Sequence, residues 1–186
     1  MTDEPTVLVV DDEDKLADMY VLWLRQEYEV RTAYDAQAAV DELDDSVDVV
    51  LLDRRMPGIS GDRLLDEFAD DPPFSVIMIT AVEPDFDIID MAFDDYLCKP
   101  VQHDDLTAAI DYQIAVQGRD DRLRKYSVAR AKLAVLEAEK SRHELSNSST
   151  YGELQSTAQR LESLLEDSVP DFDEVDEEFQ AIGRTT

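Results

Sequence analysis

Apolar runs alternate with amphipathic stretches along the first 118 residues of the chain. Short runs of branched apolar residues are typical of buried strands, and apolar residues spaced by three and four are typical of helices. Strands are predicted at Thr6–Val10, Tyr28–Ala33, Val49–Asp53, Ser75–Thr80 and Asp95–Cys98. Helical patterns follow them, at Leu16–Leu24, Ala36–Leu43, Ser60–Phe68, Phe86–Phe93 and from Asp104 or Asp105 onward. Five rounds of strand and helix predict an α/β fold, a parallel sheet with helices on both faces.

The pattern changes after Gly118, where a largely helical part begins. Residues 122–145 contain neither Gly nor Pro and carry a partial apolar stripe. After a Ser-rich break, a second helix is predicted from Ser149 or Thr150, with Leu154, Ala158, Leu161 and Leu165 on one face. The two stripes predict an antiparallel helical hairpin. The acidic segment Asp171–Phe179 is either a short docked helix or a disordered tail. The predicted domains are therefore 1–118 and 119–186.

The charge of the chain is extreme, with 45 acidic against 17 basic residues and a formal net charge of −28 over 186 residues. Such a surface repels itself at ordinary ionic strength, and molar salt screens this repulsion. We therefore expect a protein of a high-salt cytoplasm, from an extreme halophile; an acidic mesophilic protein is the alternative. The lone Cys98 excludes an internal disulfide. No apolar run is long enough to span a membrane, so we expect a soluble, cytoplasmic protein without membrane contacts.

Acidic side chains stand at the ends of two predicted strands. Asp53 follows a four-residue apolar run and precedes the Pro57-Gly58 turn, and Asp11 and Asp12 follow the first strand. A flavodoxin-like strand order of 2-1-3-4-5 would place these strands side by side, at the edge where open α/β sheets bind ligands. Three clustered carboxylates need a cation, and an all-oxygen anionic site suits Mg²⁺. With Mg²⁺ bound, Asp53 could act as a nucleophile that carries a phosphoryl group.

Two further polar residues end the fourth and fifth predicted strands. Thr80 could donate a hydrogen bond to a phosphoryl oxygen, and Lys99 could neutralise its charge. Each residue has an ordinary structural explanation by itself: a helix cap for Asp11 or Asp12, a turn acid for Asp53, a surface lysine, a strand-ending hydroxyl. Five such residues at successive strand ends favour a functional site.

The segments VLVVDDE, LLDRRMPG, MITA and DDYLCKP resemble, in this order, the motifs of response-regulator receiver domains. The resemblance covers about residues 5–117 and implies that Asp53 accepts phosphate from a histidine kinase. It also implies that Mg²⁺ is bound directly by Asp12, by Asp53 and by the backbone carbonyl of Arg55, with Asp11 acting through water. By the same resemblance Thr80 is the switch hydroxyl, Lys99 the phosphate-binding lysine and Tyr96 the switch aromatic residue, and the Lys99–Pro100 bond is cis.

The segment between Thr80 and Lys99 departs from the receiver pattern because it is a few residues short. The loss falls on the fourth helix, whose face commonly carries dimerisation and output, so the usual receiver dimer is not assumed. Residues 119–182 resemble the HalX domain of haloarchaeal response regulators, through LAVLEAEKSRHEL, a Ser-rich break and YGELQSTAQRLESLLED. This resemblance names the second domain without defining its biochemical role.

Three functions are compatible with these features. The first is a phosphorylation switch, not an enzyme, whose hairpin contacts a downstream protein, with a homodimer through the receiver or the C-terminal helices left open. The second is a DNA-binding regulator, suggested by eight basic residues between Arg119 and Arg142; phosphate contacts weaken steeply with salt, which argues against it. The third is an aspartyl phosphatase, which requires a second acid where this chain has Arg55.

Overall fold

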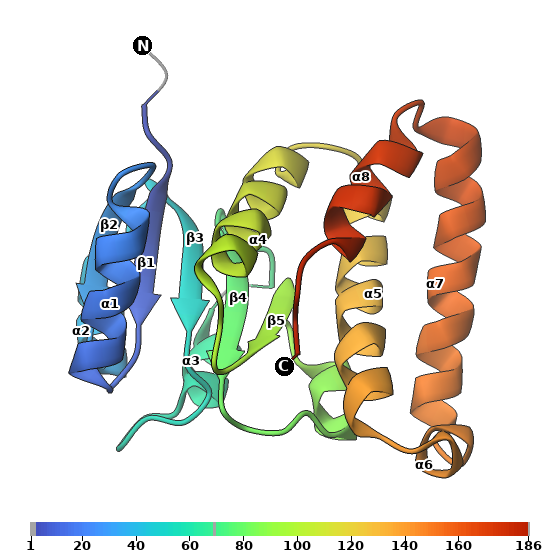
Figure 1. Ribbon diagram of the computed structural model, residues 1–186, viewed down its shortest axis with the longest axis horizontal. Coiled ribbons are helices and arrows are strands. Elements are labelled where there is room, and N and C mark those ends of the chain that lie inside the picture. The colour runs from blue at the N-terminus through green and yellow to red at the C-terminus, as the bar shows by residue number, and fades with distance from the viewer. Residues whose placement is uncertain (1–2, 69, 186) are drawn as a thin grey trace.

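A five-stranded parallel sheet forms the centre of the computed structural model, which describes residues 3–68 and 70–185 (Figure 1). Its strands are β1 (Thr6–Val10), β2 (Glu29–Ala33), β3 (Val47–Leu52), β4 (Ser75–Thr80) and β5 (Asp95–Cys98). Their order is β2-β1-β3-β4-β5, and all neighbouring pairs are parallel. The predicted fold class and strand order are confirmed.

Helices cover both faces of the sheet, which explains why its central strands are apolar throughout. α1 (Asp14–Leu24) and α4 (His103–Val116) pack on the face that carries Val7 and Val49. α2 (Ala36–Glu42) and α3 (Gly61–Glu67) pack on the opposite face. β1 and β4 are therefore buried along their whole length, whereas the edge strand β2 is mostly half-exposed.

The connection between β4 and β5 differs from the prediction. The expected helix over Phe86–Phe93 is instead a 3-10 turn, η1 (Phe86–Asp90). It begins at Asp85, whose carboxylate accepts a hydrogen bond from the Phe86 N–H, and Met91 ends it in an extended conformation. The prediction was wrong here because a shortened connection leaves room for little more than one turn.

The C-terminal part is helical and consists of α5 (Asp121–Glu139), α6 (Arg142–Ser146), α7 (Ser149–Ser168) and α8 (Phe172–Gln180). Figure 1 shows α5 and α7 side by side beyond β5, joined at one end by α6, which is the predicted antiparallel hairpin. The predicted single helix over residues 122–145 is interrupted at Lys140, which is extended, and Ser141 starts α6 with a capping box to Glu144. The acidic tail is a docked helix, with Phe172, Val175 and Phe179 buried.

The hairpin is packed against the edge of the parallel sheet rather than held apart from it. α5 lies along β5 and contributes side chains to the cores on both faces of the sheet, including Leu123 on one side and Leu133 on the other. Past α8 the chain returns to β5, where the Cys98 N–H donates to the Arg184 carbonyl at 2.8 Å. The side of the sheet at η1 and β5 is therefore occupied by the chain's own C-terminal part. This is the side at which the usual receiver dimer was not assumed from the sequence.

No helix of the described residues has an apolar stretch long enough to cross a lipid bilayer.

Candidate functional site

Three carboxylates meet where β1 and β3 end. Oxygens of Asp11, Asp12 and Asp53 all lie within 4.8 Å of one another. The parallel pairing of β1 with β3 produces this cluster, because the Asp53 N–H donates to the Val10 carbonyl at 3.0 Å and continues the ladder. Asp11 and Asp53 are buried, with 2% and 6% of their surface exposed, and Asp12 is half-buried. The predicted proximity of the three acids is confirmed.

Lys99 reaches into this cluster from the end of β5. Its Nζ lies 2.8 Å from Asp11 Oδ2 and 3.1 Å from Asp53 Oδ2, and 3.7 Å from the more exposed Glu13. The backbone holds Lys99 in place, since its N–H donates to the Thr80 carbonyl and its bond to Pro100 is cis, as the receiver resemblance implied. One ammonium group therefore serves two buried carboxylates.

The electrostatics of the cluster leave it short of positive charge. Burial raises the pKa of Asp53, and the charge of Lys99 offsets this only in part. For Lys99, burial opposes protonation, but its hydrogen bonds and charge interactions with Asp11 and Asp53 raise its pKa above the ordinary value. Three carboxylates beside one lysine form a donor set of hard oxygens, which fits Mg²⁺. The cluster could hold such an ion.

An open pocket of about 640 Å³ lies over the cluster and is lined by five of the seven predicted site residues. These are Asp12, Asp53, Arg55, Thr80 and Lys99. Asp11 lies beneath the pocket, where its Oδ1 accepts from the Glu13 N–H at 2.9 Å. The Arg55 N–H is 3.3 Å from Asp53 Oδ1, and the Arg55 side chain is exposed.

Thr80 and Tyr96 hold the loop that follows β4. The buried Thr80 Oγ1 accepts from the Val82 N–H at 3.1 Å, and the Tyr96 hydroxyl donates to the Val82 carbonyl at 2.9 Å. Tyr96 is fully buried, and this burial raises its pKa to about 12. Both residues thus contact one peptide segment at the rim of the pocket.

Two important residues beside Asp53 were not predicted. Arg54 is buried, forms three hydrogen bonds to Asp62 and one to Asp87, and so joins the end of β3 to α3 and η1. Gly61 lies so close to the Asp53 backbone that a Cβ there would come within 1.8 Å of its carbonyl oxygen. A glycine after a Pro-Gly turn was a signal for such an approach, but no sequence pattern identifies the partners of Arg54.

The parallel sheet and its acidic pocket define a receiver-type α/β domain. The chain belongs to the response regulator receiver domain family, whose model matches residues 7–111, and it continues into a HalX domain matched over residues 116–182. Its first part is therefore the receiver domain of a two-component response regulator.

Relatives agree with this assignment. A putative transcriptional regulator of Haloferax volcanii is 43% identical over 137 residues, which are 73% of this chain and 24% of that protein. Sensory transduction protein RegX3 of Mycobacterium tuberculosis is 36% identical over 121 residues, 62% of this chain and 53% of that protein. The chain thus spans between a quarter and about half of the length of these curated relatives.

Solved structures match the receiver part. A receiver domain protein from Clostridium thermocellum is 30% identical with a TM-score of 0.54, covering 60% of this chain and 94% of that one. Response regulator TrrA from Thermotoga maritima, in complex with Mg²⁺-BeF, is 29% identical with a TM-score of 0.50, covering 59% and 98%.

Proposed function

We propose that this protein is a phosphorylation switch in which Asp53 accepts a phosphoryl group from a histidine kinase in a Mg²⁺-dependent reaction. The observation that carries the proposal is the position of Lys99, whose Nζ bonds to both Asp11 and Asp53 beneath an open pocket. The TrrA relative, bound to Mg²⁺-BeF, supports the choice of metal.

In the proposed reaction, a carboxylate oxygen of Asp53 attacks phosphorus and forms an O–P bond while the P–N bond to the kinase imidazole breaks. The imidazole leaves with the electron pair of that bond and takes up a proton. The Lys99 ammonium and the Thr80 hydroxyl bind the phosphoryl oxygens. The metal would be held by Asp12, Asp53 and the Arg55 carbonyl, with Asp11 acting through water. When bound, it would neutralise charge between the carboxylates and the phosphoryl group.

The phosphoryl group would also engage the switch residues. Thr80 Oγ1, whose hydroxyl would donate to a phosphoryl oxygen, accepts from the Val82 N–H, and Tyr96 holds the carbonyl of the same residue. Phosphorylation would therefore alter the loop that leads from β4 into η1. Slow hydrolysis of the Asp53 phosphate by the protein itself would end the signal. The protein would thus limit the duration of the signal rather than act as an enzyme on a separate substrate.

Intact mass spectrometry tests the proposal. The full chain is incubated with acetyl phosphate and Mg²⁺ in molar KCl. We expect one added phosphoryl group, none in Asp53→Asn, and normal addition in Asp66→Asn, which removes an exposed acid from α3. A chain that gains no phosphoryl group, or an Asp53→Asn chain that gains one, would contradict the proposal.

The output is proposed to be a protein contact made by the C-terminal hairpin, residues 119–186, under control of the receiver, residues 1–118. We place the protein in the cytoplasm, where the kinase would meet it. Since the C-terminal part covers β5, a homodimer through that face would require displacement of α5 or of the segment around Arg184. The C-terminal helices offer another surface for dimerisation.

A DNA-binding output is the second candidate, because the Haloferax relative is named a putative transcriptional regulator. The eight basic residues between Arg119 and Arg142 argue against it, since half of them already form ion pairs inside the protein. Arg119 binds Asp171, Arg122 binds Asp120, Arg124 binds Asp71 and Asp94, and Lys140 binds Asp85. A mobility shift that persists in molar salt and disappears when Arg122, Arg124 and Lys125 are replaced would reverse this ranking.

A further inference from the structure

The 3-10 turn η1 is held from two sides by basic residues. On the receiver side, Arg54 Nη2 lies 2.7 Å from Asp87 Oδ2. On the hairpin side, Lys132 Nζ donates to the carbonyls of Ile89 at 2.7 Å and Met91 at 2.8 Å. Lys140 Nζ, near the other end of α5, lies 3.0 Å from Asp85, the cap of η1. A single turn of chain thus joins the residue after Asp53 to the first helix of the hairpin.

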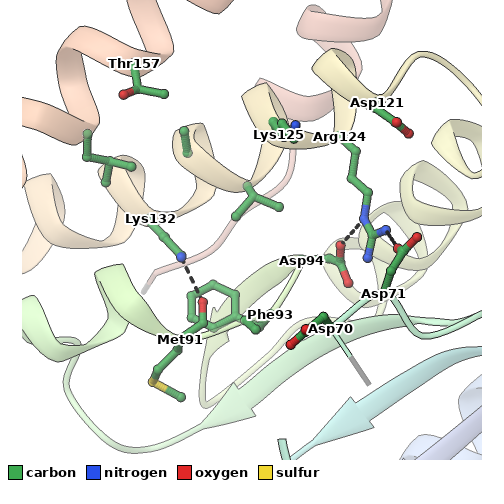
Figure 2. A pocket seen from close by; sticks show the side chains of 14 residues that line it. Asp70, Asp71, Met91, Phe93, Asp94, Asp121, Arg124, Lys125, Lys132 and Thr157 are labelled. Atoms are coloured by element: carbon green, nitrogen blue, oxygen red, sulfur yellow. Dashed lines mark hydrogen bonds and ion pairs between the residues drawn. The ribbon is translucent and has the colours of Figure 1, made fainter. Parts of the chain in front are cut away.

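Lys132 depends on η1 for its hydrogen bonds. Its side chain is buried, with 6% of the residue exposed, and it forms no ion pair among the described residues. Figure 2 shows it reaching from α5 to the Met91 carbonyl above the Phe93 ring, whose centroid is 5.1 Å from Nζ. Its acceptors are backbone carbonyls at the end of η1, so any refolding of this turn would leave a buried ammonium without them.

The segment after η1 also contacts the predicted switch residue Tyr96. The Phe93 ring packs on Tyr96 at a centroid distance of 5.5 Å, and Tyr96 bonds to Val82 in the loop before η1. A cavity of about 470 Å³ separates this part of the receiver from α5 and α7, lined by Met91, Phe93 and Lys132 among others (Figure 2). The cavity provides space for α5 to shift when η1 moves.

We infer that η1 transmits the phosphorylation state of Asp53 to the HalX hairpin. Arg54 holds η1 from the receiver side, and Lys132 of α5 and Lys140 at the end of α5 contact it from the hairpin side. The inference rests on the proposed phosphorylation of Asp53 and adds its route of regulation. A signal can shift α5 only through contacts that differ between two states. The bonds of Lys132 to Ile89 and Met91 are such contacts, because they require the present geometry of the turn.

Hydrogen–deuterium exchange of α5 tests the route. The full chain is compared at pH 7 in molar KCl with and without Mg²⁺ and acetyl phosphate, and intact mass records the fraction of Asp53 loaded. We expect loading to change exchange in α5 by about fivefold, the factor that corresponds to one net hydrogen bond. In Lys132→Met we expect unchanged loading and loss of this response. Lys125→Met, on an exposed lysine of the same helix, should respond like the wild type.

A second pair of variants tests the receiver side, and keeps the test valid if Lys132→Met does not fold. Asp87→Ala removes the acceptor of the Arg54 bond, whereas Asp90→Ala removes another acid from the same turn and leaves that bond intact. We expect a reduced α5 response in the first and a normal one in the second. A loaded wild type without an α5 response, or variants that respond fully, would overturn the inference. A wild type that cannot be loaded would overturn the proposed function itself, and the mass measurement distinguishes the two failures.

Discussion

Arg184 and Asp95 form a buried bidentate ion pair across 89 positions of the chain. Arg184 Nε lies 2.8 Å from Asp95 Oδ1, and Nη2 lies 3.0 Å from Oδ2. The side chains are 5% and 0% exposed, and the guanidinium also stacks on the Phe179 ring at 3.9 Å. Because Asp95 begins β5 and Arg184 follows α8, this pair fastens the end of the C-terminal part to the edge of the receiver sheet.

Removal of Arg184 should therefore destabilise the whole molecule. Arg184→Met leaves the Asp95 carboxylate buried without its partner, a change that typically costs about 3–5 kcal/mol. Urea unfolding in molar KCl measures the effect, with Arg142→Met, on an exposed base of α6, as the control. In the double variant with Asp95→Asn, the loss should be smaller than the sum of the single losses. A loss below about 1 kcal/mol in Arg184→Met would show that the pair contributes little.

The sequence was sufficient to predict the sheet and the acidic site, because both follow from patterns within short segments of the chain. Apolar runs identify strands, and parallel strands bring their carboxyl ends to one edge, so Asp11, Asp53 and Lys99 had to meet once the strand order was assumed. The ion pairs of Arg54 and Arg184 could not be predicted, because both arginines have partners that only tertiary packing selects. The same holds for the contacts of η1 with Lys132 and Lys140, which come from a distant part of the chain.

Two glycines should respond in opposite directions to the same substitution. Gly61→Ala would place a methyl group 1.8 Å from the Asp53 carbonyl oxygen, so the start of α3 must move. We expect a loss of about 3 kcal/mol or more in the free energy of unfolding, together with slower phosphorylation of the displaced Asp53. Gly152→Ala, in the open on α7, should stabilise the protein by about 0.5–1 kcal/mol. Urea unfolding compares them, and equal effects would show that the close approach at Gly61 is unimportant.

Mg²⁺ should stabilise the folded protein through the three clustered carboxylates. A ligand at one hundred times its Kd adds about 2.7 kcal/mol to stability. Asp12→Asn should lose most of this gain without destabilising the metal-free protein, because it removes one of three neighbouring negative charges. Thermal unfolding can be followed through Trp23, the single tryptophan of the chain. Asp14→Asn is the control, since it removes an exposed charge nearby. If Mg²⁺ stabilised Asp12→Asn as much as the wild type, the gain would reflect general screening.

Lys132 should give the stability a distinct dependence on alkaline pH. Burial lowers its pKa from 10.5 to about 8 in the folded protein. Between these values the unfolded chain binds more protons than the folded one, so the contribution of Lys132 to stability rises with pH and is constant below about pH 8. From pH 8 to 10 the rise amounts to about 2–3 kcal/mol.

Urea unfolding at pH 7, 8, 9 and 10 isolates this contribution when wild type and Lys132→Met are compared. We expect the free energy of unfolding of the wild type to rise relative to that of the variant between pH 8 and 10. Lys125→Met should parallel the wild type, because that lysine is exposed. Parallel curves for the wild type and Lys132→Met would mean that the ammonium keeps an ordinary pKa. In that case the carbonyls of Ile89 and Met91 would compensate fully for its burial.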